Sequence, residues 1–251
     1  MRAMTCYVVR LTALAIGVFS SECVLASDES KTQDAFAVAR ERMVIEQLVS
    51  EIHGRAISDP AVLGAMRRVP RHAFVLPEAV SLAYTDQPLP IGAGQTISQP
   101  FIVALMTELA EVHPGDRVLE VVTGSGYQAA VLASLTESVY SIEILDALAR
   151  HADEVLRTLG YAVRIRVGDG FFGWPEAAPF DAILVTAAAP RVPQPLVDQL
   201  AAGGRLVIPL GDTVQELVVF RKTGWALSQE RVIPVRFVPM TGAIESPRGQ
   251  P

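Results

Sequence analysis

The chain has 251 residues, half of them apolar, and its 27 acidic residues outnumber its 21 basic residues to give a net charge of −6. This composition can bury the core of one large domain, or of a domain with an appendage, and it excludes global disorder. No run of Lys or Arg could follow a phosphate backbone, so we expect no nucleic-acid partner.

The N-terminal segment, residues 1–26, differs from the rest of the chain. Arg2 and Arg10 precede a short apolar run at 11–19, and the small residue Ala26 closes the segment. This order is typical of a secretory signal peptide, and the apolar run is too short to span a bilayer. We therefore predict export, to the periplasm, with no stable membrane contact after cleavage. A cytoplasmic protein is the alternative if the segment is not a functional signal.

Both cysteines, Cys6 and Cys23, lie inside this segment. A mature chain without thiols excludes disulfides, thiolate metal sites and cysteine nucleophiles. The histidines also lack the close spacing of a metal site, so we predict no metal and expect structural or surface roles for them. They are His53, His72, His113 and His151.

Two helices are predicted after a flexible lead-in at 27–33. The first covers 36–52, where apolar residues recur at helical spacing and Asp34 can cap the start. Asp59 followed by Pro60 predicts the start of the second, because proline is well tolerated at the first helical position. We expect these helices to form an N-terminal helical subdomain.

An irregular stretch rich in proline and glycine follows the helices, over 74–100. Long irregular stretches between compact elements are more often functional than idle. We therefore predict a helical cap and substrate loop over 34–100, a cofactor-binding sheet over 101–242 that begins with a helix at 101–112, and a flexible tail over 243–251.

From Arg117 onward, short β-branched runs alternate with stretches of helical pattern. This alternation predicts an α/β fold with a doubly wound, mostly parallel sheet. The predicted strands lie at 117–122, 139–144, 163–169, 181–187 and 204–210, and the predicted helices at 127–135, 146–159 and 195–202. Two further runs, 215–222 and 230–240, have no helix between them and predict antiparallel strands at one edge of the sheet.

Ligands of such sheets bind beyond the carboxyl ends of the strands, where four loops carry suggestive residues. Gly124 and Gly126 form a glycine turn, and Glu143 follows at the distance typical of an acid that holds a ribose diol. Asp169 could accept from an adenine amino group, and the small side chains after Thr186 leave room for a ligand. Each feature alone has a structural alternative, such as tight packing, a solvated carboxylate or a helix cap. Their order on successive strands predicts one nucleoside cofactor laid across the sheet.

Both NAD and S-adenosylmethionine fit this outline. The methyl donor is favoured because no third glycine follows Gly126 in the dinucleotide register, and because the last strands are antiparallel. The chain resembles the protein-L-isoaspartate O-methyltransferases, which are class I S-adenosylmethionine-dependent enzymes. The stretches that carry the resemblance include VLGAMRRVPRHAFV (62–75), YTDQPLPIGAGQTISQPFIVALMTELA (84–110), GSGYQAAVLA (124–133) and GGRLVIPLG (203–211), and together with shorter ones they cover nearly all of 40–242.

The resemblance implies an enzyme that transfers a methyl group to the free carboxyl of L-isoaspartyl residues in damaged proteins and peptides, starting repair through a succinimide. It implies that Ser98 is the active-site residue, and we expect its hydroxyl to orient the substrate carboxylate rather than to act as a nucleophile. The predicted substrate-binding residues are Tyr84, Asp86, Thr96, Ile97 and Gln99. The predicted cofactor-binding residues are Val122, Gly124, Ser125, Gly126, Glu143, Ile144, Asp169, Gly170, Thr186 and Gln215. We expect a monomer.

One residue departs from the family pattern. The first motif of the family reads E-x-G-x-G-x-G, and Val122 replaces its first glycine. A β-branched residue resists positive φ, and its two methyl groups occupy space near the methionine end of the cofactor. Two alternatives to the active enzyme therefore stay open: a degenerate, non-catalytic homologue, and a methyltransferase for another carboxylate substrate.

Overall fold

The computed structural model describes residues 35–51, 54–224 and 226–246, and the chain divides into two compact units, Met1–Ala37 and Val38–Pro251. The predicted signal peptide, the lead-in at 27–33, the capping residue Asp34 and His53 lie outside the described residues, as does most of the predicted tail. Within the described part of the chain, no helix is long and apolar enough to cross a membrane.

Both predicted N-terminal helices are present. Residues 38–43 are α-helical and continue as the π-helical segment η1 (Val44–Val49). α2 (Pro60–Arg68) begins where the sequence predicts it, because the Asp59 side chain accepts hydrogen bonds from Ala61 N at 2.7 Å and Val62 N at 3.3 Å.

The stretch at 74–100 is more regular than its sequence indicates. Two 3₁₀ helices, η2 (Arg71–Phe74) and η3 (Pro77–Leu82), lead to an antiparallel hairpin of β1 (Leu89–Gly92) and β2 (Gln95–Ile97). Strands this short, interrupted by proline and glycine, lack the alternation that would reveal them. Only Ser98 and Gln99 separate the end of β2 from α3 (Pro100–Ala110), so the hairpin and the helix hold this part of the predicted substrate loop between them.

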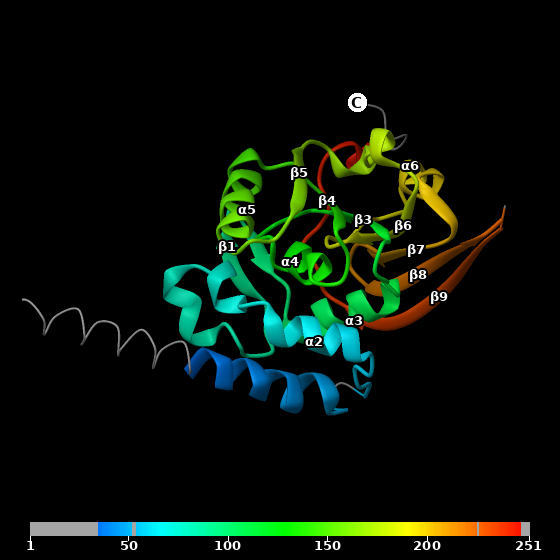
Figure 1. Ribbon diagram of the computed structural model, residues 1–251. Helices are drawn as coiled ribbons and strands as arrows, with labels where there is room; N and C mark the ends of the chain where they lie inside the picture. The colour runs from blue at the N-terminus through cyan, green and yellow to red at the C-terminus, as the bar shows by residue number, and fades with distance from the viewer. Residues whose placement is uncertain (1–34, 52–53, 225, 247–251) are drawn as a thin grey trace, which may run out of the picture. The chain divides into compact units, whose positions relative to one another are not determined.

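The central sheet has seven strands in the order β5-β4-β3-β6-β7-β8-β9, parallel from β5 to β7 and antiparallel from β7 to β9 (Figure 1). This arrangement confirms the predicted fold class. The strands are β3 (Arg117–Val121), β4 (Ser138–Glu143), β5 (Val163–Val167), β6 (Phe180–Val185), β7 (Leu200–Leu210), β8 (Gln215–Thr223) and β9 (Ala226–Val235). The connecting helices are α4 (Tyr127–Ala133), α5 (Asp146–Thr158) and α6 (Gln194–Asp198). The prediction of a helix to residue 202 was wrong, because Leu200 already pairs with Phe180 in the sheet.

Both faces of the sheet are covered. Successive residues of β3 enter different cores: Val118 packs with the core that includes α3 and α4, whereas Leu119 packs with the core beneath α6. Strand residues buried on both sides explain the near-continuous apolar runs in the sequence. Because β4 and β6 flank β3, the chain reverses its winding direction there, and the loops after β3, β4 and β6 meet at one edge.

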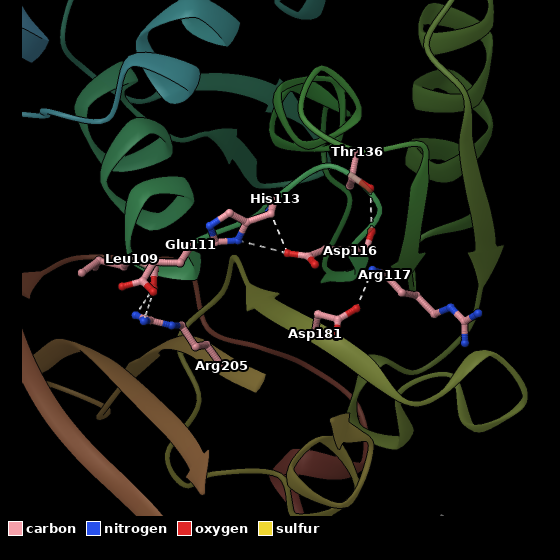
Figure 2. Close-up of polar contacts among 8 residues, drawn as sticks. All are labelled: Leu109, Glu111, His113, Asp116, Arg117, Thr136, Asp181 and Arg205. Carbon is pink, nitrogen blue, oxygen red and sulfur yellow. Dashed lines mark hydrogen bonds and ion pairs between the residues drawn. The ribbon is translucent and has the colours of Figure 1, made fainter. Parts of the chain in front are cut away.

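Polar contacts fasten the opposite edge of the sheet, where the strands begin (Figure 2). Arg205 of β7 pairs with Glu111 and donates to Leu109 O at the end of α3, where a cation is favourable because the last helical carbonyls lack partners. Asp181 accepts from Arg117 N at 2.8 Å and joins the starts of β3 and β6. These contacts join the end of α3, β3, β6 and β7 on the side of the sheet opposite the carboxyl-end loops.

Candidate active site

The turn after β3 carries the predicted cofactor glycines. Gly124 has a φ of +54° and Gly126 a φ of +85°, both in the left-handed region that glycine adopts without strain. Val122 has the same kind of backbone, with a φ of +77°. For a residue with a side chain, this conformation costs about 1–2 kcal/mol. The turn therefore requires a glycine conformation at a position that a valine occupies.

Neighbouring strands hold Val122 in this conformation. Its backbone N–H and that of Thr123 both donate to Ile142 O, at 2.8 and 3.1 Å, and Thr186 Oγ1 donates to Val122 O at 2.6 Å. Strained residues persist only where the surrounding structure over-determines them. The partners from β4 and from the loop after β6 meet that condition.

Glu143 lies directly against the glycine turn. Its buried carboxylate accepts from Gly124 N at 2.9 Å and from Leu145 N at 3.0 Å. Each carboxylate oxygen keeps further acceptor capacity, which a ribose diol could use. The structure thus brings together the predicted turn and the predicted ribose acid.

The other residues of the turn have structural contacts. Ser125 Oγ accepts from Tyr127 N at 3.3 Å, at the start of α4. A Cβ added at Gly126 would lie 3.2 Å from atoms of Ala152 and Leu156, so this glycine allows α5 to pack closely.

A buried polar cluster behind the turn was not predicted. Glu120 is fully buried in β3, and its carboxyl accepts from Ser141 Oγ at 2.5 Å. The pKa of Glu120 is raised to about 8, chiefly by burial; the hydrogen bond from Ser141 lowers it and the negative charge of Glu143 raises it. Glu120 Oε1 and Gln128 Oε1 have no hydrogen-bond partner among the described residues. A glutamate inside the apolar run at 117–122 was the signal available in the sequence.

Asp169 is engaged by the backbone. It accepts from Phe171 N at 2.9 Å, which caps η4 (Gly170–Phe172), and from Ala243 N at 2.6 Å. Asp169 thus acts as a helix cap, which is the structural alternative that the sequence left open. An adenine contact by Asp169 stays a prediction. Gly170 is needed for close approach, because a Cβ there would overlap the Val121 side chain.

The predicted substrate residues divide into two groups. Asp86 accepts from Gln99 Nε2 and from Phe101 N, both at 3.0 Å, and so anchors the end of the loop to α3. The hydroxyl of Tyr84 lies 2.7 Å from His72 Nδ1 and accepts from Arg40. Tyr84 and Asp86 thus contact other parts of the protein, and direct contact with substrate stays a prediction for both.

Ser98 and the glycine turn line the same space. We call it the inner cavity; its volume is about 30 Å³, and its lining includes Thr96, Ile97, Ser98, Gly124, Ser125 and Thr186. Segments about 25 residues apart in the sequence therefore form one site, as the resemblance implies. Glu120 and Gln128 also line it, so their unpartnered oxygens belong to the site.

A second space lies beyond the ends of β3 and β4. This strand-end cavity, of about 20 Å³, is lined by Glu143, Ile144, Gly170 and Met240 among others. Val122 and Gln95 line both cavities. A nucleoside cofactor that reached from Glu143 to Ser98 would therefore lie against Val122 and Gln95, which line both spaces.

Gln215 has a different environment from the other predicted cofactor residues. Its side chain accepts from Phe237 N at 2.6 Å and donates to Phe237 O at 3.3 Å, which fixes the chain after β9. Cofactor contact by Gln215 stays a prediction. Over 35–51, 54–224 and 226–246, no group of three or more His, Cys, Asp or Glu side chains is placed to hold a metal ion.

Comparison with known proteins agrees with this geometry. A family model described as protein-L-isoaspartate(D-aspartate) O-methyltransferase matches residues 40–245. A protein-L-isoaspartate O-methyltransferase from Gloeobacter violaceus is 54% identical over 202 residues, 79% of this chain and 97% of that protein. One from Opitutus terrae is 52% identical over 235 residues, 92% of this chain and 97% of that protein.

A solved structure extends the comparison to the fold. The structure is of a putative protein-L-isoaspartate O-methyltransferase from Plasmodium falciparum in complex with S-adenosyl-L-homocysteine, and it superimposes with a TM-score of 0.66 at 27% identity. The match covers 74% of this chain and 92% of that one. By its sequence and its fold, the chain belongs to the protein-L-isoaspartate O-methyltransferase family.

Proposed function

We propose that this chain transfers a methyl group from S-adenosylmethionine to the free carboxyl of L-isoaspartyl residues in damaged proteins and peptides. The observation that carries the proposal is the inner cavity, where Ser98 of the substrate loop and the glycine turn line one space. The names of the relatives supply the substrate class.

The residues present fit such a cofactor with one exception. Glu143 would hold the ribose, Gly124 and Gly170 allow close approach, and Ile144 offers a partly exposed apolar surface. The exception is Val122, a β-branched residue at a glycine position that lines both cavities. When bound, S-adenosylmethionine would supply an electrophilic methyl group for transfer to the substrate carboxylate, and the electron pair of the broken carbon–sulfur bond would remain on sulfur.

The protein's own contribution is positioning. The α-carboxyl of an isoaspartyl residue has a pKa of about 3.5 and is an anion at neutral pH, so no general base is needed. We expect the Ser98 hydroxyl to donate to this carboxylate while Asp86 holds Gln99 and the start of α3. Correct placement of two reactants can contribute about 7–11 kcal/mol.

A transfer assay tests this function. Labelled methyl groups should pass to an isoaspartyl peptide and not to the same peptide with a normal aspartate. Loss of one hydrogen bond to a charged group, about 1.5–3 kcal/mol, should lower kcat/KM of Ser98→Ala by roughly 10- to 150-fold. Ser228→Ala, on exposed β9, is the matched control and should be unchanged. Transfer to neither peptide by a protein that binds the cofactor would refute the proposal.

Val122 favours a second candidate, a non-catalytic relative that binds protein but not the methyl donor. A β-branched side chain at a glycine position that lines both cavities opposes cofactor binding. A binding measurement distinguishes the two candidates. If the protein is the non-catalytic relative, it should show no methyl transfer and no measurable affinity for S-adenosylhomocysteine, and Val122→Gly should recover both.

We also propose that the protein is exported and acts as a monomer. Support for export comes from the charge and hydropathy pattern of residues 1–26. Fusion of residues 1–35 to a reporter that is active only outside the cytoplasm tests it, with Arg2→Glu/Arg10→Glu as the control. Light scattering during size-exclusion chromatography should give the mass of one mature chain, and a dimer mass would contradict the monomer.

A further inference from the structure

One basic residue lines the cavities around Ser98. Arg236, just after β9, is exposed and lines a space of about 40 Å³ that Ser98 and Thr186 also line, which we call the mouth cavity. It also lines the neighbouring outer pocket, of about 720 Å³. Among the residues that line these two spaces, the inner cavity and the strand-end cavity, it is the only Lys or Arg.

The guanidinium of Arg236 is available to a ligand. It makes no hydrogen bond or ion pair with any residue that the structure describes. Arg231, five residues earlier and within β9, is instead paired with Glu216 of β8. An unpaired cation beside a cavity is notable in a chain whose net charge is −6, because carboxylates to pair with it are plentiful.

The backbone that carries Arg236 is fixed. Gln215 binds both the N–H and the carbonyl of Phe237. Val238, the next residue, accepts at its carbonyl oxygen from Ala188 N at 2.9 Å, and Met240 N donates to Ala188 O at 2.8 Å. The segment after β9 is therefore tied to β8 and to the loop that follows Thr186, which places Arg236 in the wall of the mouth cavity.

We propose that Arg236 binds the α-carboxylate of the isoaspartyl residue, and that the outer pocket receives the neighbouring residues of the peptide. This inference rests on the proposed function and names the residue that recognises its substrate. The Ser98 hydroxyl can donate one hydrogen bond, whereas a guanidinium donates two in a geometry that matches a carboxylate. The outer pocket suits a peptide chain because its lining is largely apolar, with Phe101, Ile102, Ile233 and Val235.

The arrangement separates peptide binding from cofactor binding. Arg236 lines neither the inner cavity nor the strand-end cavity, where the glycine turn and Glu143 lie. Its removal should therefore weaken peptide binding and leave cofactor affinity unchanged. Because a charge-assisted pair is screened by salt, peptide affinity should also fall as ionic strength rises.

The test measures peptide affinity without turnover, on the full protein saturated with S-adenosylhomocysteine. Two peptides are compared: an isoaspartyl peptide, and the same peptide with that α-carboxylate replaced by a carboxamide. The wild type should prefer the carboxylate. In Arg236→Gln the Kd for the isoaspartyl peptide should rise by roughly 10- to 150-fold and the preference should disappear, while Arg236→Lys should keep part of it.

Arg231→Gln is the matched control, since it removes a nearby arginine of β9 whose guanidinium is already paired with Glu216. It should bind both peptides as the wild type does, and the Kd for S-adenosylhomocysteine should be equal in all variants. Wild-type affinity and preference in Arg236→Gln would overturn the role of Arg236 alone. A wild type that does not distinguish isoaspartyl from aspartyl peptides would overturn the proposed function, and this inference with it.

Discussion

Replacing Val122 by glycine should restore an open cofactor cleft. Val122 has a φ of +77° and lines both the inner and the strand-end cavity. Glycine removes both the backbone strain and the two methyl groups of a residue that lines both cavities. We expect Val122→Gly to bind S-adenosylhomocysteine at least about tenfold more tightly than the wild type, which corresponds to about 1.4 kcal/mol.

The stability of this variant should change much less than its affinity. Relief of the left-handed conformation contributes about 1–2 kcal/mol. Two terms oppose this gain: about 0.5–1 kcal/mol for the conformational freedom of glycine in the unfolded chain, and about 1 kcal/mol for the lost burial of a partly buried valine. The free energy of unfolding should therefore change by less than about 1.5 kcal/mol in either direction.

Isothermal titration with S-adenosylhomocysteine, without peptide, measures the affinity, and urea unfolding of the ligand-free protein measures the stability. Val122→Ala separates the two causes, because it keeps the strained Cβ and removes only the methyl groups. If alanine equals glycine, the methyl groups obstruct the cleft; if only glycine binds tightly, the backbone does. A glycine variant that binds no more tightly than the wild type would refute the reasoning.

Three other predictions concern groups with defined contacts. Glu120 has a folded pKa of about 8, above its unfolded value of 4.5, so the free energy of unfolding should fall by on the order of 4 kcal/mol as pH rises from 4.5 to 8. Urea unfolding across this pH range measures the fall, which should be smaller in Glu120→Gln. Asp59→Ala removes the cap of α2 and should lower the free energy of unfolding by about 1 kcal/mol, whereas Asp153→Ala, in an exposed pair with Arg157, should change it by less than about 0.5 kcal/mol. Asp86→Ala removes the acceptor of Gln99 Nε2 and Phe101 N and should lower kcat/KM roughly tenfold or more, while the Kd for S-adenosylhomocysteine stays unchanged. An equal loss of kcat/KM and of cofactor affinity would contradict a role confined to the substrate loop.

Much of the fold follows from local patterns. The alternation of β-branched runs with helical stretches predicts the parallel sheet, and Asp59 with Pro60 predicts the start of α2, because both signals lie within a few neighbouring residues. The hairpin of β1 and β2 escaped prediction because its stability depends on pairing and on the packing of Leu89 and Ile97 into the core, not on its own sequence.

The candidate site, like the fold, was predictable from the sequence only in part. The sequence by itself determined the order of the glycine turn, Glu143 and Ser98, and the structure brings all three to one cleft. Only the tertiary structure decided that Val122 has a left-handed backbone, because the hydrogen bonds that impose it come from Ile142 on β4 and from Thr186 in the loop after β6. Likewise, the burial of Glu120 and the unpaired state of Arg236 depend on which distant residues surround each side chain, and that is settled by packing across the sheet.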